Sequence, residues 1–221
     1  MDVKAGGFTF GEDQTEREAG GLSAAGGFSP CRCAPGVISC VLTLKRPVAD
    51  FTTRPLEPAD QFRLWDWLHL ALWDPPPAPR RPREVLDHPG VSIYAEGWGR
   101  EGDVGVVGEM DGKPIGACWV RLIPGRAGLG HVDDETPQLG IALEPEYRGR
   151  GFGRRLMLAA LEAARAHGYR QVSLTVHPQN PAGALYESCG FQKREVRTTY
   201  HLMVVSLGQN GESDAHGRSA R

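Results

Sequence analysis

Hydrophobic and polar residues change their spacing repeatedly along the middle of the chain. Apolar residues recur at helical spacing over 58–73, until a proline block at 75–79 ends the segment. A second short helix is expected over 83–87. The β-rich runs 104–109 and 115–122 flank the turn sequence Met-Asp-Gly-Lys-Pro at 110–114, which predicts a hairpin. Residues 138–143 form the next predicted strand.

The second half of the chain continues this alternation. The pattern over 154–167 predicts a helix that ends at Gly168. Its expected buried stripe is Leu156, Ala159, Ala160, Ala163 and Ala164. A strand over 172–176 precedes a helix that Asn180 caps and Gly190 ends, and 191–207 reads as two further strands. This order of strands and helices predicts an α/β domain with a mixed sheet.

The two ends of the chain lack this periodicity. Residues 1–48 contain three glycine pairs within a polar stretch, and residues 208–221 are similarly polar. Such segments bury too little apolar surface to offset the entropy of ordering them. We therefore expect a disordered arm over 1–48, one folded domain over 49–207 and a flexible tail over 208–221.

Composition narrows the class of protein only in part. The 25 basic and 27 acidic residues give a formal net charge of -2, which argues against nucleic acid as a partner. No apolar run approaches the ~18 residues of a membrane span, and the first residues lack the apolar core of a secretory signal. The five scattered cysteines do not suggest disulfides, and Cys31 and Cys33 lack a second ligand pair at zinc spacing. We expect a cytoplasmic protein without metal or membrane partner.

A glycine-rich segment joins the predicted strand 138–143 to the following helix. Gly149, Gly151 and Gly153 alternate with other residues, and arginines stand at 148, 150 and 154. Glycine lets the backbone approach a ligand closely, and the N–H groups at a helix N-terminus attract phosphate. The spacing fits neither a dinucleotide-binding fingerprint nor a Walker loop. On glycine content alone, a plain turn with solvated arginines stays open.

Two motifs resemble those of the GCN5-related N-acetyltransferase (GNAT) superfamily. The sequence Arg-Gly-Arg-Gly-Phe-Gly at 148–153 matches the R/Q-x-x-G-x-G/A motif, and Leu-Gly-Ile-Ala-Leu at 139–143 looks like the fourth strand. The segment 180–191 resembles the family's N-x-x-A-x-x-L-Y-x-x-x-G-F sequence. The resemblance covers 49–207 and implies a GNAT fold, with a mixed central sheet of splayed strands flanked by helices. It further implies acetyl-CoA-dependent transfer of an acetyl group to a primary amine of a small molecule or peptide.

The resemblance also implies where acetyl-CoA binds. The splayed strands would be 138–143 and 172–176, with the coenzyme between them. Tyr186 would donate a proton to the departing thiolate, and the N–H of Leu143 would polarise the thioester carbonyl. The residues implied for the coenzyme are Ile141, Ala142, Leu143, Arg148, Gly149, Arg150, Gly151, Phe152, Gly153, Arg154, Asn180 and Tyr186.

The general base is less well defined. Many members carry Glu near the start of the fourth strand, where this chain has Gln138. Asp133, Asp134 and Glu135 lie just upstream, with His131 close by, and we expect Glu135 to act as the base or as a relay through water. A solvated acidic loop is the alternative reading, and Glu144 is another candidate base, although it is expected to face solvent in the turn. Because glutamine cannot act as a base, a second function stays open, a non-catalytic regulatory module that binds acyl-CoA and has the same architecture.

The acceptor site is the least readable part of the sequence. By resemblance it is built from the first two helices and their loop, a region that contains Trp65, Trp67, Trp73 and the pair Arg80-Arg81. Tryptophans at helical spacing are expected in the core. The arginines either bind an acidic acceptor or stay hydrated, and both readings stay open. So does a homodimer, because many members are dimers.

Overall fold

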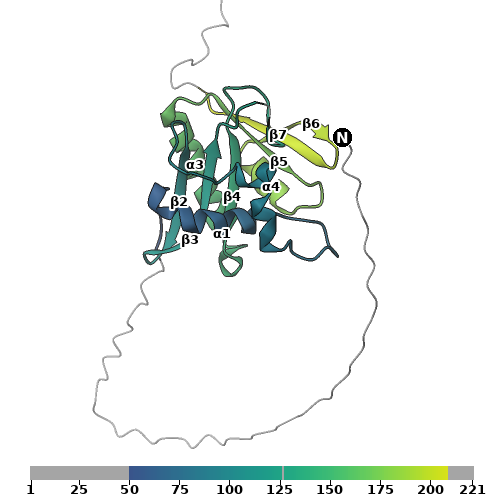
Figure 1. Cartoon of the computed structure of the whole chain (residues 1–221). Helices are drawn as coiled ribbons and strands as arrows, with labels where there is room; N and C mark the ends of the chain where they lie inside the picture. The colour runs from purple at the N-terminus through teal and green to yellow at the C-terminus, as the bar shows by residue number, and fades with distance from the viewer. Residues whose placement is uncertain (1–49, 126, 209–221) are drawn as a thin grey trace, which may run out of the picture. The chain divides into compact units, whose positions relative to one another are not determined.

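A computed structural model describes residues 50–125 and 127–208, which form a seven-stranded sheet flanked by helices (Figure 1). The predicted arm and nearly all of the predicted tail lie outside the described residues, as do Cys31 and Cys33. The strand order is β1-β2-β3-β4-β5-β7-β6, and β4 and β5 are the one parallel pair. The strands are β1 (Phe51–Pro55), β2 (Val104–Met110), β3 (Lys113–Arg121), β4 (Gln138–Leu143), β5 (Gln171–Val176), β6 (Gln192–Arg197) and β7 (Tyr200–Ser206).

The expected longer helices are present with small shifts at their ends, whereas the helix expected over 83–87 is a 3-10 turn and the short helix at 89–92 was not predicted. The helices are α1 (Gln61–Ala71), α2 (Pro89–Ser92), α3 (Phe152–His167) and α4 (Ala182–Ser188), with 3-10 turns η1 (Pro58–Asp60), η2 (Arg83–Asp87) and η3 (Pro145–Tyr147). Helix α3 starts two residues before the expected position, because Gly151 occupies its N-cap with φ 83°. Within the described residues no helix has the length and apolar character needed to cross a membrane.

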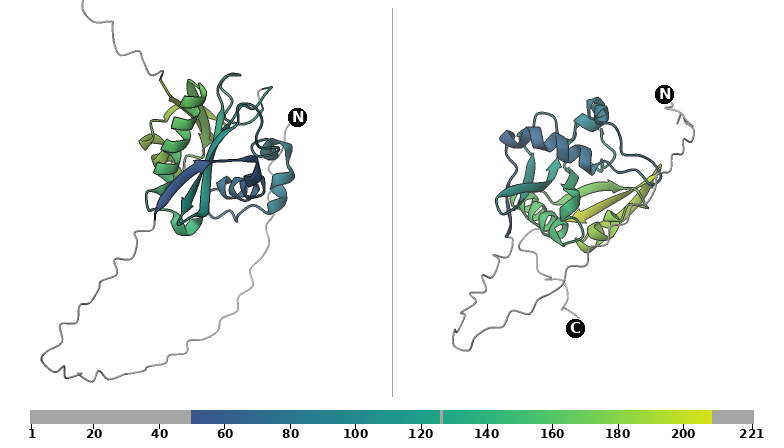
Figure 2. Two further views of the ribbon diagram at one scale, coloured as in Figure 1. Left: turned by 90° about the vertical axis from the view of Figure 1, so that its left-hand side faces the viewer. Right: turned by 90° about the horizontal axis from the view of Figure 1, so that it is seen from below.

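Each face of the sheet packs against its own helices. Along β3, Cys118 and Val120 belong to the cluster that packs on α3, whereas Ala117 and Trp119 belong to the cluster that packs on α1. This alternation follows from the two-residue period of a strand. Figure 2 shows α1 and α3 on opposite faces of the sheet.

The buried stripe of α3 is wider than expected. Leu156, Ala160 and Ala164 are buried, as predicted, but Met157 and Leu161 are buried with them. The remaining members of the expected stripe, Ala159 and Ala163, are only partly buried against the same cluster. A helix that lies across a sheet buries a broad apolar face, so the larger side chains fill the space beside the alanines.

The parallel pair β4 and β5 is joined at one end only. A single residue pair, Gln138 with Ser173, connects the two strands, and the Ser173 N–H donates to the carbonyl of Pro137 at 3.0 Å. The Ser173 hydroxyl donates to the carbonyl of Gly130 at 2.6 Å, which fastens this narrow end. Beyond it the strands diverge, so the backbone edges that face each other lack ladder partners. The splayed strands predicted from the sequence are confirmed.

Candidate active site

A cleft opens where β4 and β5 diverge. It is bounded by the first half of β4, the second half of β5, the end of α1 and the segments that follow these elements. Its lining residues are Leu68, Ala71, Leu72, Trp73, Arg81, Gly90, Val91, Tyr94, Trp119, Leu129, Gly130, Gln138, Leu139, Gly140, Leu174, Thr175, Val176, His177, Asn180, Tyr186 and Tyr200. No Asp or Glu stands among these described residues, so the cleft wall is apolar with a few neutral or basic groups.

The N-terminus of α3 is open for an anion. Gly149 and Gly151 have φ of 70° and 83°, and a Cβ built on either glycine meets no atom within 4 Å. No side chain caps this end, and its first turn carries no acidic residue. The first N–H groups of a helix have no partner inside the helix and attract negative charge. The predicted phosphate loop therefore has the local geometry that phosphate binding needs.

The arginines of this loop have different positions. The Nε of Arg148 donates to the carbonyl of Leu143 at 2.8 Å, which holds its guanidinium at the end of β4. Arg150 lies over the ring of Phe152, with 5.2 Å between the guanidinium carbon and the ring centroid. Arg155 points elsewhere, because its Nη2 donates to the carbonyl of Phe51. Two of the predicted arginines, 148 and 150, thus have defined positions beside the open glycines.

The backbone of β4 presents donors to the gap between the strands. The Glu144 N–H donates to the carbonyl of Ile115 on β3 at 2.9 Å. Because the N–H groups of a strand point alternately to its two sides, those of Ile141 and Leu143 face away from β3 and toward the gap. The carbonyl of Leu143 accepts a hydrogen bond from Arg148, so the N–H of Leu143 is the backbone group of this residue that is left for a ligand.

Tyr186 and Asn180 both line the cleft. The side-chain oxygen of Asn180 accepts the N–H of Ala182 at 2.9 Å and so orders the start of α4. The Tyr186 ring packs edge-on against Phe191, with centroids 6.2 Å apart. Burial, with a smaller contribution from nearby Cys118, raises the pKa of Tyr186 well above its ordinary value. The hydroxyl is therefore protonated at any working pH and is available as a donor.

Gln138 is a structural residue at the narrow end of the cleft. Its Oε1 accepts the Tyr94 hydroxyl and the Gly130 N–H, each at 2.9 Å, and its Nε2 donates to the carbonyl of Ala127 at 3.0 Å. The side chain is almost fully buried. Its amide donor and acceptor are both used to hold the segment 127–130 against β4.

The acidic loop lies at a separate hollow. Glu135 lines a depression with Asp133, Asp134 and residues around the start of β5, and it is not among the residues that line the cleft. Asp133 accepts the hydroxyl of Thr136 at 2.5 Å and the side-chain amide of Gln171, and the Thr136 bond is the main reason that its pKa is lowered. The structure therefore does not bring Glu135 together with Tyr186.

Comparison with known proteins agrees with this geometry. Residues 64–191, more than half of the chain, match the Acetyltransferase (GNAT) family. The chain belongs to the GNAT family. It is 34% identical over 94 residues to a putative [ribosomal protein bS18]-alanine N-acetyltransferase of Bacillus subtilis, which is 42% of this chain and 56% of that protein. It is 26% identical over 220 residues to a mycothiol acetyltransferase of Tsukamurella paurometabola, covering 90% of this chain and 69% of the relative. The chain spans about half the length of the first curated relatives it matches.

Solved structures show the same fold. A putative acetyltransferase from Salmonella typhimurium, solved with its cofactor acetyl-CoA, superposes with a TM-score of 0.53 at 19% identity. The match covers 76% of this chain and 99% of that one. The predicted GNAT fold is thus confirmed.

The sequence motifs of this GNAT domain did not predict that five further residues meet in the cleft. Trp73, Arg81, Tyr94, His177 and Tyr200 come from five separate segments, and their meeting depends on the fold. The sequence places Trp73 and Arg81 in the region expected to build the acceptor site, and His177 directly follows a predicted strand and stands three residues before Asn180. Tyr94 and Tyr200 have no such signal. Among the tryptophans, Trp67 is buried in the core as expected, whereas Trp73 lines the cleft.

Proposed function

We propose that this chain is an acetyl-CoA-dependent N-acetyltransferase that moves an acetyl group to a primary amine of a small molecule or peptide by direct attack. The observation that carries the proposal is the divergence of β4 and β5 from a single residue pair, with Tyr186 at the cleft it opens. The open N-terminus of α3 follows the same end of β4. A diphosphate, an extended thioester arm and an attacking amine need these three features together.

The residues present fit acetyl-CoA. We assign the diphosphate to the backbone N–H groups of residues 150–154, where the Cβ-free space at Gly149 and Gly151 permits close approach. We assign the pantetheine arm to the exposed edge of β4 from Ile141 to Leu143. Asn180 and Tyr186 lie where the arm would enter the cleft. The remaining members of the predicted set, Arg148, Arg150, Phe152, Gly153 and Arg154, surround the diphosphate in this assignment.

Acetyl-CoA supplies an activated acetyl group as a thioester. The amine forms the new C–N bond as the C–S bond breaks. The ammonium form of the acceptor loses two protons in all, of which one ends on the released thiol and the other is released to solvent. The N–H of Leu143 is placed to donate to the thioester carbonyl. The Tyr186 hydroxyl donates its proton to the departing sulfur, and the proton that the acceptor nitrogen loses after attack restores the hydroxyl. Burial disfavours a thiolate as it disfavours a phenolate, so the raised pKa of Tyr186 does not by itself oppose this transfer.

Deprotonation of the acceptor is assigned to water. The residues that line the described cleft include no carboxylate, and Gln138 has both its amide groups engaged. In this proposal the neutral fraction of the amine enters the cleft, and the lost proton leaves through solvent. The rate should then rise with pH up to the pKa of the acceptor itself.

The names of the relatives do not identify the acceptor of this chain. One is named for alanine of a ribosomal protein and another for mycothiol, and these are chemically different molecules. The free, buried Cys118 and Cys189 support the proposal of a cytoplasmic location, where thiols stay reduced. A monomer and a homodimer are separated by sedimentation of the purified chain.

The test is release of free thiol from acetyl-CoA in the presence of a panel of amines and peptides, with calorimetric binding of coenzyme A measured in parallel. Binding together with acceptor-dependent thiol release supports the enzyme. Binding without release for any acceptor supports the alternative, a non-catalytic acyl-CoA-binding module. Absence of binding contradicts both.

A further inference from the structure

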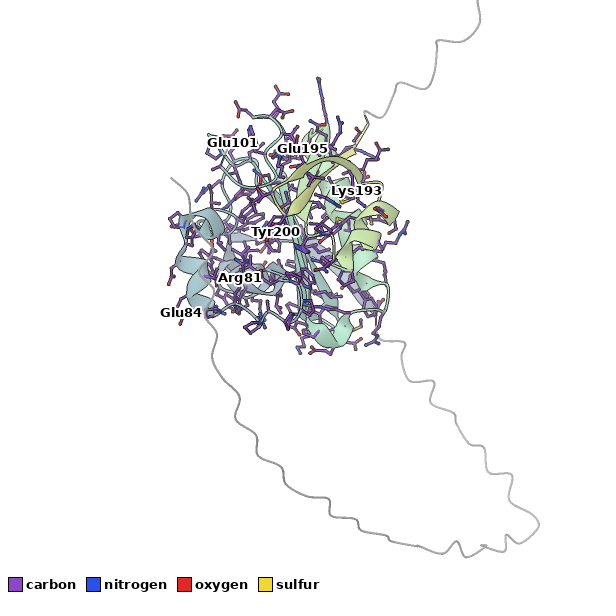
Figure 3. All side chains as sticks on the ribbon, turned by 90° about the vertical axis from the view of Figure 1, so that its right-hand side faces the viewer. Arg81, Glu84, Glu101, Lys193, Glu195 and Tyr200 are labelled. Atoms are coloured by element: carbon purple, nitrogen blue, oxygen red, sulfur yellow. The ribbon has the colours of Figure 1, made fainter. Side chains whose placement is uncertain are left out.

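One wall of the cleft carries polar side chains that the proposed chemistry does not use. Arg81 belongs to the segment after the proline block, His177 follows β5, and Tyr200 opens β7. Trp73, just after α1, lies beside them and contacts the His177 ring, with centroids 5.5 Å apart. Figure 3 labels Arg81 and Tyr200 on the same face of the molecule.

Arg81 is held in place by its neighbours. Its Nε and Nη2 donate to the two carboxylate oxygens of Asp74, both at 2.6 Å. The ring of His69, on α1, donates from Nε2 to the Arg81 carbonyl at 2.8 Å and accepts Arg80 at Nδ1. A guanidinium has more N–H groups than the Asp74 pair uses, so donors remain for a ligand. Asp74 is not among the cleft-lining residues, although it lies close enough to His177 for that ring to contribute, after Arg81, to the lowered pKa of the carboxyl.

His177 also presents a donor. Its Nδ1 accepts the N–H of Gln179 at 3.2 Å, so the neutral ring carries its proton on Nε2. The Tyr200 ring packs edge-on against it at 5.9 Å. The Tyr200 hydroxyl lies close enough to Arg81 to contribute, after the larger effect of Asp74, to the raised pKa of that guanidinium. Three side chains that can donate hydrogen bonds thus share one wall.

The charge of the cleft favours one class of acceptor. A diamine or polyamine needs acidic groups to hold its second cation, and the described lining has none. An oxyanion, in contrast, is well matched by a preoriented guanidinium and neutral N–H and O–H donors. Trp73, Leu72 and Val91 supply apolar surface between this wall and the rest of the cleft.

We infer that the acceptor is a primary amine that also bears a carboxylate, and that Arg81, Tyr200 and His177 bind the carboxylate while the amine reaches the thioester. The inference rests on the proposed function, because it names the acceptor class of that same site. It gives Arg81 the acidic-acceptor role that the sequence left open beside simple hydration.

The probes are free amino acids and 4-aminobutanoate, each compared with its own carboxamide, which keeps the shape and removes the charge. 1,4-Diaminobutane is the dicationic probe. Rates are compared per neutral amine, because an amide group lowers the pKa of a nearby amine. For the preferred acid we expect kcat/KM about tenfold or more above its carboxamide, the scale of a charge-assisted hydrogen bond. The Arg81→Gln variant should lose this preference, so that its ratio of kcat/KM for the acid to kcat/KM for the carboxamide falls to about one.

Matched variants separate recognition from folding. Arg83→Gln removes an exposed arginine of the same segment that pairs with Asp66 and lies outside the cleft lining, so the preference should persist. In Arg81→Gln alone, the unpaired Asp74 carboxylate could repel an acidic acceptor. The double variant Asp74→Asn/Arg81→Gln removes that carboxylate, so if the preference for acids is still lost, repulsion by Asp74 is not the cause. Tyr200→Phe should reduce the preference about threefold.

Direct binding measurements separate failure of the inferred acceptor class from failure of the proposed enzyme activity. Calorimetry of the chain loaded with coenzyme A, titrated with each acid and carboxamide, reports recognition without turnover. Preference for acids in binding with no thiol release would retain the inference and contradict the proposed enzyme. Thiol release with carboxamides or the diamine at least equal to that with every acid, or no binding of any acid, would overturn the inference.

Discussion

Tyr186 lines the apolar cleft, and its partly buried ring packs against the core beside it. Tyr186→Phe keeps the ring and its packing on Phe191 while removing the proton donor. We expect turnover to fall roughly 10²-fold, the usual scale for a positioned acid, with coenzyme A affinity and thermal stability nearly unchanged. Because burial raises the pKa of Tyr186, the wild-type rate should show no decline from its ionisation up to about pH 10.

The measurements are steady-state thiol release across pH and calorimetric binding of coenzyme A. Single-turnover rates ensure that chemistry, and not product release, is compared. Nearly full turnover in the variant would reduce Tyr186 to a packing residue. Equal losses of affinity and turnover would make it a contact for the coenzyme.

Gln138 shows why a residue at a family's catalytic position can be structural. Its Nε2 donates to the Ala127 carbonyl, and a carboxylate cannot make that bond. Gln138→Glu should therefore lower the free energy of unfolding by about 1–3 kcal/mol at pH 7 and should not raise turnover. The introduced carboxyl has a raised folded pKa, so the deficit should be smallest below its unfolded pKa of about 4.3 and grow as pH rises. Urea unfolding at several pH values tests this, and a gain in turnover would restore the position as a base site.

At the scale of elements, the turn into α3 is the clearest target. Gly151→Val places a branched side chain at φ 83° in space that we assign to the diphosphate. Gly168, at the opposite end of α3, has φ 106° and equally open surroundings, so Gly168→Val imposes left-handed strain away from the site. We expect both variants to lose stability, and only the first to lose coenzyme A affinity, by about tenfold or more. Calorimetry on the two folded variants decides, and equal affinities would refute the assignment.

The junction between β1 and α1 depends on a buried carboxylate. Asp60 accepts two bonds from Arg54, at 2.7 and 2.9 Å, and one from the Glu57 N–H. The Arg54 bonds are the main cause of its lowered pKa. A lowered folded pKa gives stability that is present above the unfolded pKa of 3.8 and is lost as pH falls through the folded value.

We therefore expect Asp60→Asn to lower the free energy of unfolding by about 1–2 kcal/mol at pH 7, a figure discounted because Arg54 is partly exposed. The loss should be small at a pH low enough to protonate Asp60 in both the folded and the unfolded state. Chemical unfolding of the wild type and the variant from neutral to strongly acidic pH gives the difference directly. A cost that stays constant across this range would mean that shape, and not charge, holds the junction.

Local patterns explain most elements, and their failures have physical causes. The strand 138–143 has the same bounds in sequence and structure, because its apolar run is bordered by proline on both sides. The start of α3 was misplaced because a glycine in the left-handed region, which apolar spacing does not reveal, ends the turn. Glu135 is near β4 in sequence but precedes its narrow end, whereas Tyr186 lies at the cleft. Arg81 and Tyr200 are 119 positions apart, and only the sheet order brings them to one wall.

At the scale of the molecule, the sheet consists of two parts that meet at the β4–β5 pair. Strands β1 to β4 form one antiparallel part, and β5, β7 and β6 form the other. Because a single residue pair links them, α3 and the network of Gln138 and Ser173 must supply much of their attachment. The cleft is thus a consequence of how the two parts join, and ligands bound across it should stabilise the fold.

The described core begins at Phe51 and ends at Leu207, both of which are buried. Every buried side-chain nitrogen or oxygen in the described residues has a hydrogen-bond partner there. We therefore expect a chain that starts at Lys45 to unfold at nearly the same temperature as the full chain and to bind coenzyme A equally well. Scanning calorimetry with and without coenzyme A measures both properties, since a ligand that binds the folded state raises the unfolding temperature. A large fall in the unfolding temperature without ligand would show that residues 1–44 pack on the domain. An unchanged temperature with a smaller shift on adding coenzyme A would instead place those residues at the coenzyme site, and either result would contradict the domain boundary proposed from the sequence.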